Sequence, residues 1–255
     1  MKRLTLAALV MVLLAGCVTT SSRTRLDEQA NTDQAVQTYI QIGYRHFENN
    51  NLHQAKAALN EALSLDDQAA GAYLGLARVF DVERETALAE ENFQRAVRYG
   101  GGTESTFQYA VFLYNEGRYQ AARDRFSDVT DDAFYLRRAQ SFEYLALSER
   151  RLGHDAAAIA AYRRTLTLDR QRASAYLGLA DLLYHQGESS DAFDAYQSFR
   201  RLADAQQSAS SLWLGIRLAE AINRPELTVE LADQLARRFA NSEEFQLYQS
   251  WREER

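Results

Sequence analysis

The chain has 255 residues, and its 35 acidic side chains outnumber 29 basic ones, which gives a net charge of −6. Because the charges form no basic patch, this balance argues against nucleic-acid binding and against electrostatic docking to anionic lipid. A composition rich in alanine and leucine, with one proline, predicts an all-helical protein. A single cysteine leaves no disulfide and no cysteine-based metal site within the chain.

The N-terminus has the layout of an export signal. The basic start "MKR" precedes an uncharged run, residues 4–16, that is shorter than the roughly 20 apolar residues of a membrane span but suits a signal-peptide core. The run ends in "LAGC", which resembles the bacterial lipobox, where cleavage before the cysteine frees its thiol to carry lipid. We therefore predict a signal peptide at 1–16 and lipidation of Cys17. A secretory signal with an incidental cysteine, or an uncleaved anchor, remains open.

Residues 17–35 connect this anchor to the rest of the chain. The segment is polar with little to bury, which predicts a flexible tether. Several acyl chains on Cys17 are expected to hold the protein durably, at about 0.8 kcal/mol per buried methylene. Val18 follows the cysteine, and by resemblance to the bacterial sorting rule this favours the outer membrane, facing the periplasm. Loss of residues 1–16 removes two basic side chains and changes the net charge from −6 to −8.

A repeat of about 34 residues dominates the remainder. A small residue that follows a large apolar one recurs at steps of 34, 33, 36, 34 and 35 residues. An alanine lies twelve positions further on in five copies, and Leu227 replaces it in the last. The pattern resembles the tetratricopeptide repeat, a pair of antiparallel helices. Small residues at the crossing let the helix axes approach to about 8–10 Å. The six small residues are Gly43, Ala77, Ala110, Ala146, Ala180 and Gly215.

This resemblance predicts an all-α, superhelical solenoid of about six helix-turn-helix repeats. Glycines are expected at the left-handed ends of first helices, and Pro225 at the start of a second helix. Asn241 and Glu244 have the spacing of a capping box, which predicts a final capping helix. The expected glycines are Gly117, Gly153 and Gly187. The predicted repeats are 36–69, 70–102, 103–138, 139–172, 173–207 and 208–240, followed by the capping helix at 241–255.

Signatures of catalysis are missing from the sequence. There is no HExxH, GxSxG or glycine-rich phosphate loop, and four scattered histidines suggest no ligand cluster. The histidines are His46, His53, His154 and His185. We predict a protein that is not an enzyme, with no metal, no cofactor besides the covalent lipid on Cys17, and no small-molecule substrate. An enzyme, or an enzyme's regulatory module, is the least favoured alternative.

A repeat solenoid instead offers a groove lined mainly by the first helix of each pair. In such repeats the positions one and four after the small residue tend to face that groove, and an aromatic one turn earlier is expected to join them. A groove with bulky and charged side chains suits an extended or helical peptide. The alternative is that these aromatics pack between repeats. The predicted groove residues are Tyr44, Phe47, Arg78, Asp81, Phe107, Val111, Tyr114, Leu147, Arg150, Asp181 and Tyr184.

One family shares the combination of lipobox, tether and six repeats that this sequence resembles. The most specific stretches of the resemblance are "SLWLGIRLAEA" (211–221) and "ASAYLGLADLLYHQGESSDAFDAYQSF" (173–199). The family in question is the pilotin family of type IV pilus biogenesis and stability lipoproteins, called PilF or PilW. The resemblance implies a non-enzymatic partner of type IV pilus secretin subunits that promotes their outer-membrane localisation and multimerisation. The alternative function is a lipoprotein scaffold for another envelope machine, in β-barrel assembly or cell-wall synthesis.

Overall fold

A computed structural model describes residues 20–203 and 207–254, with side chains from residue 28 onward. The predicted signal peptide and Cys17 lie outside the described residues. In the described ranges the chain forms thirteen helices and no strand, as the composition predicts. The helices are α2 (Thr20–Glu48), α3 (Leu52–Leu65), α4 (Ala70–Val82), α5 (Thr86–Arg98), α6 (Gly102–Asn115), α7 (Tyr119–Asp131), α8 (Arg138–Arg151), α9 (Asp155–Leu168), α10 (Ala173–His185), α11 (Ser189–Ala203), α12 (Ala209–Ala221), α13 (Pro225–Arg238) and α14 (Glu243–Glu253).

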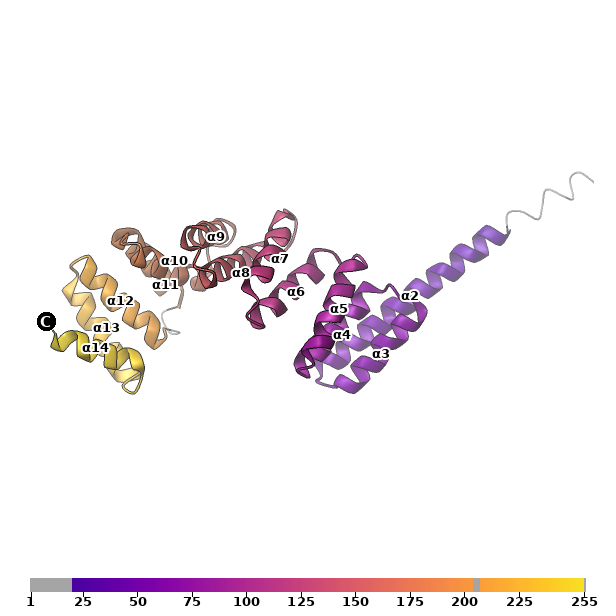
Figure 1. Ribbon diagram of the computed structural model, residues 1–255, viewed down its shortest axis with the longest axis horizontal. Helices are drawn as coiled ribbons and strands as arrows, with labels where there is room; N and C mark the ends of the chain where they lie inside the picture. Colours follow the sequence, from indigo (N-terminus) through magenta and orange to yellow (C-terminus); the bar gives the residue numbers. More distant parts are fainter. Residues whose placement is uncertain (1–19, 204–206, 255) are drawn as a thin grey trace, which may run out of the picture. The chain divides into compact units, whose positions relative to one another are not determined.

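Six helix pairs, α2–α3 through α12–α13, are followed by the single helix α14 (Figure 1). The turn inside each pair contains one residue with positive φ, as left-handed helix ends require. The residue after it donates its N–H to a carbonyl five positions earlier, for example Arg118 to Leu113 at 2.9 Å. The six residues with positive φ are Asn50, Arg84, Gly117, Gly153, Gly187 and Asn223. The three predicted glycines are therefore confirmed, and Asn or Arg adopts the same geometry in the other turns.

Small residues mark the helix crossings, which is the physical origin of the sequence repeat. A Cβ added to Gly43 would lie 2.6 Å from Cγ of Leu59, so any larger side chain would push α2 away from α3. Four alanines occupy the equivalent position with no exposed surface: Ala77, Ala110, Ala146 and Ala180. Large side chains fill the space on either side of the crossings, and Tyr196 is completely buried between its neighbours.

The chain divides into two compact units, the first ending at Ser105 and the second beginning at Thr106. Each has its own apolar core. The first packs Val36, Ile40 and Leu59 with the buried face of α4. The second has a continuous core that runs from Ala146 to Leu235 and is dominated by leucines, alanines and buried tyrosines.

The flexible tether predicted for residues 17–35 is wrong from Thr20 onward, because α2 begins there. Figure 1 shows the first half of α2 continuing beyond the end of α3. Residues 20–42 contain neither glycine nor proline, and Gln29 donates to Asp33 at 2.9 Å one turn away. The packed second half of α2 supplies the costly nucleus, and extending an existing helix is cheap even for a polar sequence. Residues 17–19 lie outside the described residues.

The last helix, α14, packs on the final repeat. Trp213 of α12 makes edge-on contacts with Tyr248 and Trp251 of α14, at centroid distances of 6.4 and 5.9 Å. The capping residue is Ser242, whose hydroxyl accepts from the Phe245 N–H at 3.2 Å. The predicted capping box of Asn241 with Glu244 is therefore wrong: the cap lies one residue later, at Ser242, and consists of a single hydrogen bond from the third helical N–H.

Candidate functional site: two groove-lining clusters

Three predicted groove residues meet in the first unit, and we call them the Arg78 cluster. The Arg78 guanidinium of α4 lies 4.5 Å from the ring centroid of Phe47 and 5.5 Å from that of Tyr44, both on α2. All three side chains are partly exposed. The arrangement is a cation on two aromatic faces, a contact of roughly 0.5–1 kcal/mol where water has access. A partner that brings an apolar or acidic side chain finds a complementary surface here.

Tyr44 is fixed more firmly than an exposed aromatic would be. Its hydroxyl donates to the Gly71 carbonyl at 3.3 Å, across from α2 to the start of α4. Burial raises the pKa of Tyr44 to about 12, and the nearby positive charge of Arg78 opposes part of that rise. Tyr44 therefore remains a neutral hydrogen-bond donor at physiological pH. Asp81, one turn after Arg78, also lies on α4 and is partly buried with interactions of its own.

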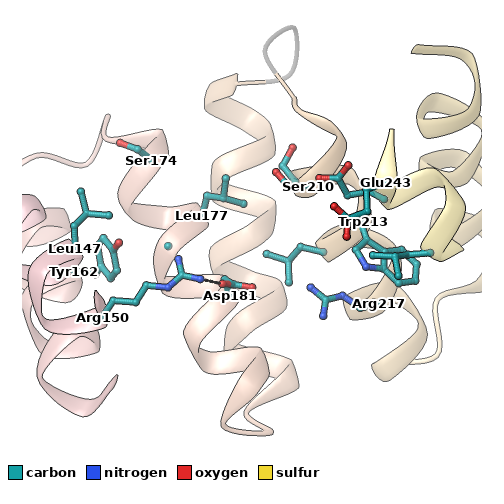
Figure 2. A pocket seen from close by; sticks show the side chains of 15 residues that line it. Leu147, Arg150, Tyr162, Ser174, Leu177, Asp181, Ser210, Trp213, Arg217 and Glu243 are labelled. Carbon is teal, nitrogen blue, oxygen red and sulfur yellow. Dashed lines mark hydrogen bonds and ion pairs between the residues drawn. The ribbon is translucent and has the colours of Figure 1, made fainter. Parts of the chain in front are cut away.

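The second unit contains a larger recess, which we call the α12 pocket. Its volume is about 500 Å³, and its lining comes from α8, α9, α10 and α12 together with the start of α14. Leucines and a tryptophan provide the apolar part of the surface, and two arginines and three carboxylates provide charge (Figure 2). The lining residues are Leu147, Arg150, Tyr162, Ser174, Leu177, Gly178, Asp181, Ser210, Ser211, Trp213, Leu214, Arg217, Glu243, Glu244 and Leu247.

Two predicted groove residues form an ion pair at one side of this pocket. Arg150 of α8 is bonded to Asp181 of α10, drawn as the dashed line in Figure 2. Asp181 also lies 3.6 Å from Nε2 of His185, one turn further along α10. Tyr162 is only 1% exposed, and burial raises its pKa to about 12. This side of the pocket is therefore electrostatically balanced and rigid.

The sequence reasoning missed most of the pocket. Leu177 lies three positions before the small residue Ala180. The prediction used the equivalent position only in the third repeat, at Phe107. Trp213 and Arg217 lie two positions to either side of Gly215. In this last repeat the positions one and four after Gly215 are fully buried, so the groove register of the earlier repeats does not carry over. Glu243, Glu244 and Leu247 of α14 have no counterpart in the repeat at all.

The prediction that Phe107 lines the groove is wrong, because this side chain is only 2% exposed. It packs against Phe126 and Tyr144, at 5.9 and 6.0 Å between ring centroids. The long connection after α7 then covers it: the Arg137 guanidinium lies 4.4 Å from its ring. The same register position, three residues before the small one, is also buried at Ile40, Leu74 and Leu212, so in these repeats it belongs to the core and not to the groove.

The remaining predicted groove residues are partly exposed but are not among those that line the α12 pocket. Tyr114 packs edge-on against Tyr119 and Tyr144, at 5.3 and 5.8 Å, so it belongs to the aromatic packing between helices. Val111 lies one turn before it on α6. Tyr184 is next to the pocket and supports Arg217, whose guanidinium lies 4.9 Å from its ring.

Other kinds of site were sought in the same residues. Within the described ranges, no three histidine, cysteine or acidic side chains lie close enough together to hold a metal ion. No helix of those ranges has the length and apolar character needed to cross a membrane. What the described part does present is side-chain recesses of the kind that receive segments of other proteins.

Stacked helix pairs with grooves lined by their first helices define the class of the protein, a tetratricopeptide-repeat solenoid. The tetratricopeptide repeat family model matches residues 40–105 and 145–209. The solved structure titled "Crystal structure of PilW, widely conserved type IV pilus biogenesis factor" has a TM-score of 0.69 at 22% identity, over 84% of this chain and 98% of that one. At that identity the likeness concerns the fold alone.

A curated relative extends the comparison to the sequence. Over 248 residues the chain is 34% identical to the type IV pilus assembly protein PilF of Pseudomonas aeruginosa, spanning 96% of this chain and 98% of that protein. The solved structure titled "Functional Characterization of Pseudomonas Aeruginosa pilF" has a TM-score of 0.78 at 33% identity, over 86% of this chain and 99% of that one. The chain belongs to the PilF family of tetratricopeptide-repeat proteins.

Proposed function

We propose that this protein is a pilotin: an outer-membrane lipoprotein that binds type IV pilus secretin subunits and promotes their localisation and multimerisation. Its role in type IV pilus biogenesis follows from its family. The observation that carries the proposal is the 34% identity to the type IV pilus assembly protein PilF, which spans nearly the whole of both chains. The protein acts as a binding scaffold for pilus machinery and not as an enzyme.

The N-terminal sequence supports the membrane part of the proposal. The lipobox-like "LAGC" places Cys17 as the first residue after cleavage, and lipid on its thiol anchors the chain to the periplasmic face of the outer membrane. The first half of α2 then acts as a helical spacer between the anchor and the repeats. Anchoring raises the effective concentration of a bound subunit at the membrane without adding any contact to it.

The Arg78 cluster supports the binding part. Tyr44 and Phe47 offer two aromatic faces beside one cation, and aromatic and arginine side chains carry much of the binding energy at protein interfaces. We assign this cluster to capture of the secretin subunit. The predicted neighbour Asp81 lies one turn away on the same helix and adds an acidic edge to the surface.

The proposal is tested by affinity capture from native membranes with the full-length protein tagged at its C-terminus. The secretin is expected as the main partner, and its multimers are expected to be lost or mislocalised in a Cys17→Ser strain. Recovery of β-barrel assembly factors or cell-wall enzymes in place of the secretin contradicts the proposal and moves the protein to another envelope machine.

The Arg78 cluster is tested in the same assay with Tyr44→Ala combined with Phe47→Ala, and separately with Arg78→Glu, which leaves the aromatic packing in place. Both variants are expected to lose secretin capture at least tenfold. Phe134→Ala with Leu136→Ala is the matched control, because these two apolar side chains are 94% and 100% exposed elsewhere. Unchanged capture by the folded cluster variants, checked by thermal melting, refutes the assignment.

A further inference from the structure

The α12 pocket contains a cation without a counter-ion. Arg217 projects from α12, and in the part of the chain that the structure describes no side chain forms an ion pair or a hydrogen bond with its guanidinium. Its Nε is shielded from solvent and lacks an acceptor there. In Figure 2 Arg150 is joined to Asp181, whereas no dashed line reaches Arg217. Because Nε is shielded, an incoming acceptor reaches this guanidinium through its terminal N–H groups.

Two aromatic rings hold the Arg217 guanidinium in place. Its central carbon lies 4.9 Å from the ring centroid of Tyr184 and 5.5 Å from that of Trp213. Cation–π contacts of this kind attract the guanidinium to the two rings without using its N–H groups as hydrogen-bond donors. A carboxylate matches those groups with two parallel hydrogen bonds, and lysine could not offer the same fork. The geometry therefore favours a planar anion over a neutral acceptor.

The rest of the lining describes what surrounds that carboxylate. Leu147, Leu177, Leu214 and Leu247 provide apolar surface from four different helices. The pocket, at about 500 Å³, falls within the size range of protein sites that enclose most of a bound group, roughly 300–1,000 Å³. This is room for one or two large apolar side chains, which would leave the carboxylate of a neighbouring acidic side chain at the edge.

The other charges decide how such a segment is oriented. Arg150 and Asp181 neutralise each other on the α8–α10 side. Glu243 and Glu244, in the first turn of α14, also line the pocket and repel an anion placed directly beside them. Among the described lining residues, Arg217 is therefore the one positive charge that can attract a carboxylate without first breaking an ion pair. The two glutamates favour a basic or neutral residue of the ligand beside them.

We propose that the α12 pocket is a second peptide-binding site, which takes a linear segment with one or two bulky apolar residues next to an acidic side chain. The apolar residues fill the leucine-lined recess and the carboxylate forms a fork-to-fork pair with Arg217. This site shares no residue with the Arg78 cluster, so it stands whether or not the secretin binds there.

The test uses the full mature chain and a display library of random dodecapeptides. The library is expected to yield binders enriched in Leu, Phe or Trp next to Asp or Glu, and their binding is expected to change the tryptophan emission, to which Trp213 and its neighbour Trp251 both contribute. In the tightest binder, replacing the acidic residue by its amide is expected to weaken binding tenfold or more. The same loss is expected from Arg217→Gln, with no further loss when the two changes are combined. Arg217→Lys is expected to recover only part of the affinity, because it restores the charge without the fork.

Arg237→Gln is the matched control, since this arginine is also on the last repeat but is exposed and pairs with Asp233 at 2.9 Å. It is expected to leave peptide affinity unchanged, and thermal melting verifies that each variant is folded. Selection of no peptide, selection of peptides without an acidic preference, or equal affinity of the Arg217→Gln and Arg237→Gln variants each overturns the proposal. None of these outcomes depends on secretin capture, so the two proposals fail separately.

Discussion

Gly178 offers the sharpest test of how tightly the repeats are packed. It lies in the middle of α10, where alanine is ordinarily better than glycine by about 1 kcal/mol. A Cβ at this position, however, would lie 2.5 Å from Cζ and 2.6 Å from the hydroxyl oxygen of Tyr162. Tyr162 is only 1% exposed and lines the α12 pocket, so its ring makes room for a Cβ only by leaving its packed position against α10.

Overpacking of this kind costs about 1–3 kcal/mol, which cancels or exceeds the helical gain. Gly178→Ala is therefore expected to lower the free energy of unfolding by up to about 2 kcal/mol, measured by urea denaturation followed by circular dichroism. In a Tyr162→Leu background the obstructing atoms are gone, and the same substitution is expected to become stabilising. The double-mutant cycle should give a coupling energy of about 1–3 kcal/mol.

Gly71→Ala is the comparison substitution, because its Cβ would meet only the Cδ1 and Cγ2 methyl groups of Ile40, at 3.3 and 3.5 Å. It is expected to be close to neutral. If Gly178→Ala raises stability by the full helical gain in the wild-type background, the steric reasoning is refuted. A cycle without coupling refutes it as well, since Tyr162 is then not the residue that demands glycine.

Two further changes probe the polar groups of the same repeats. Glu143 of α8 accepts hydrogen bonds from Ser174 and, at 2.9 Å, from Arg172, so Glu143→Ala is expected to cost about 1–3 kcal/mol in urea denaturation, and no loss would contradict this. Burial raises the pKa of Tyr44 and Tyr162 to about 12 from an ordinary value of 10, so the folded state binds more protons between these pH values than the unfolded state does. Stability is therefore expected to fall as pH rises from about 10 to 12, and replacing either tyrosine by phenylalanine should flatten the fall. Each tyrosine that is protonated when folded and ionised when unfolded contributes a slope of roughly 1.4 kcal/mol per pH unit. A slope that neither substitution changes would contradict the assignment.

The sequence determined the repeated part of the fold through local and nearest-neighbour physics. Each helix pair needs a small residue where its helices cross and a left-handed residue in its turn. Both needs are met by residues within a single repeat. The glycine pattern identified three turns, and the structure added Arg84 as a non-glycine residue in the same conformation. Polar composition misled the reading of residues 20–35, because the packed half of α2 supplies the costly nucleus and the polar residues before it, which include neither glycine nor proline, need only extend that helix.

The groove residues were predicted only where the repeat is regular. Arg150 and Asp181 follow the repeat register and do meet. Phe107 occupies a register position that is also buried at Ile40, Leu74 and Leu212, so its assignment to the groove misread a core position, and Arg137 adds further cover over its ring. The α12 pocket depends on α14, which lies outside the repeat and supplies Glu243 and Leu247.

The sequence by itself thus determined the helical class, the number of repeats, the positions of the crossings and the family to which the chain belongs, because these depend on residues close together in the chain. Only the tertiary structure decided which side chains remain accessible and which charges are left without a partner. Arg217 shows the reason: its surroundings depend on Tyr184, 33 residues earlier in the chain, and on pocket carboxylates that belong to other helices.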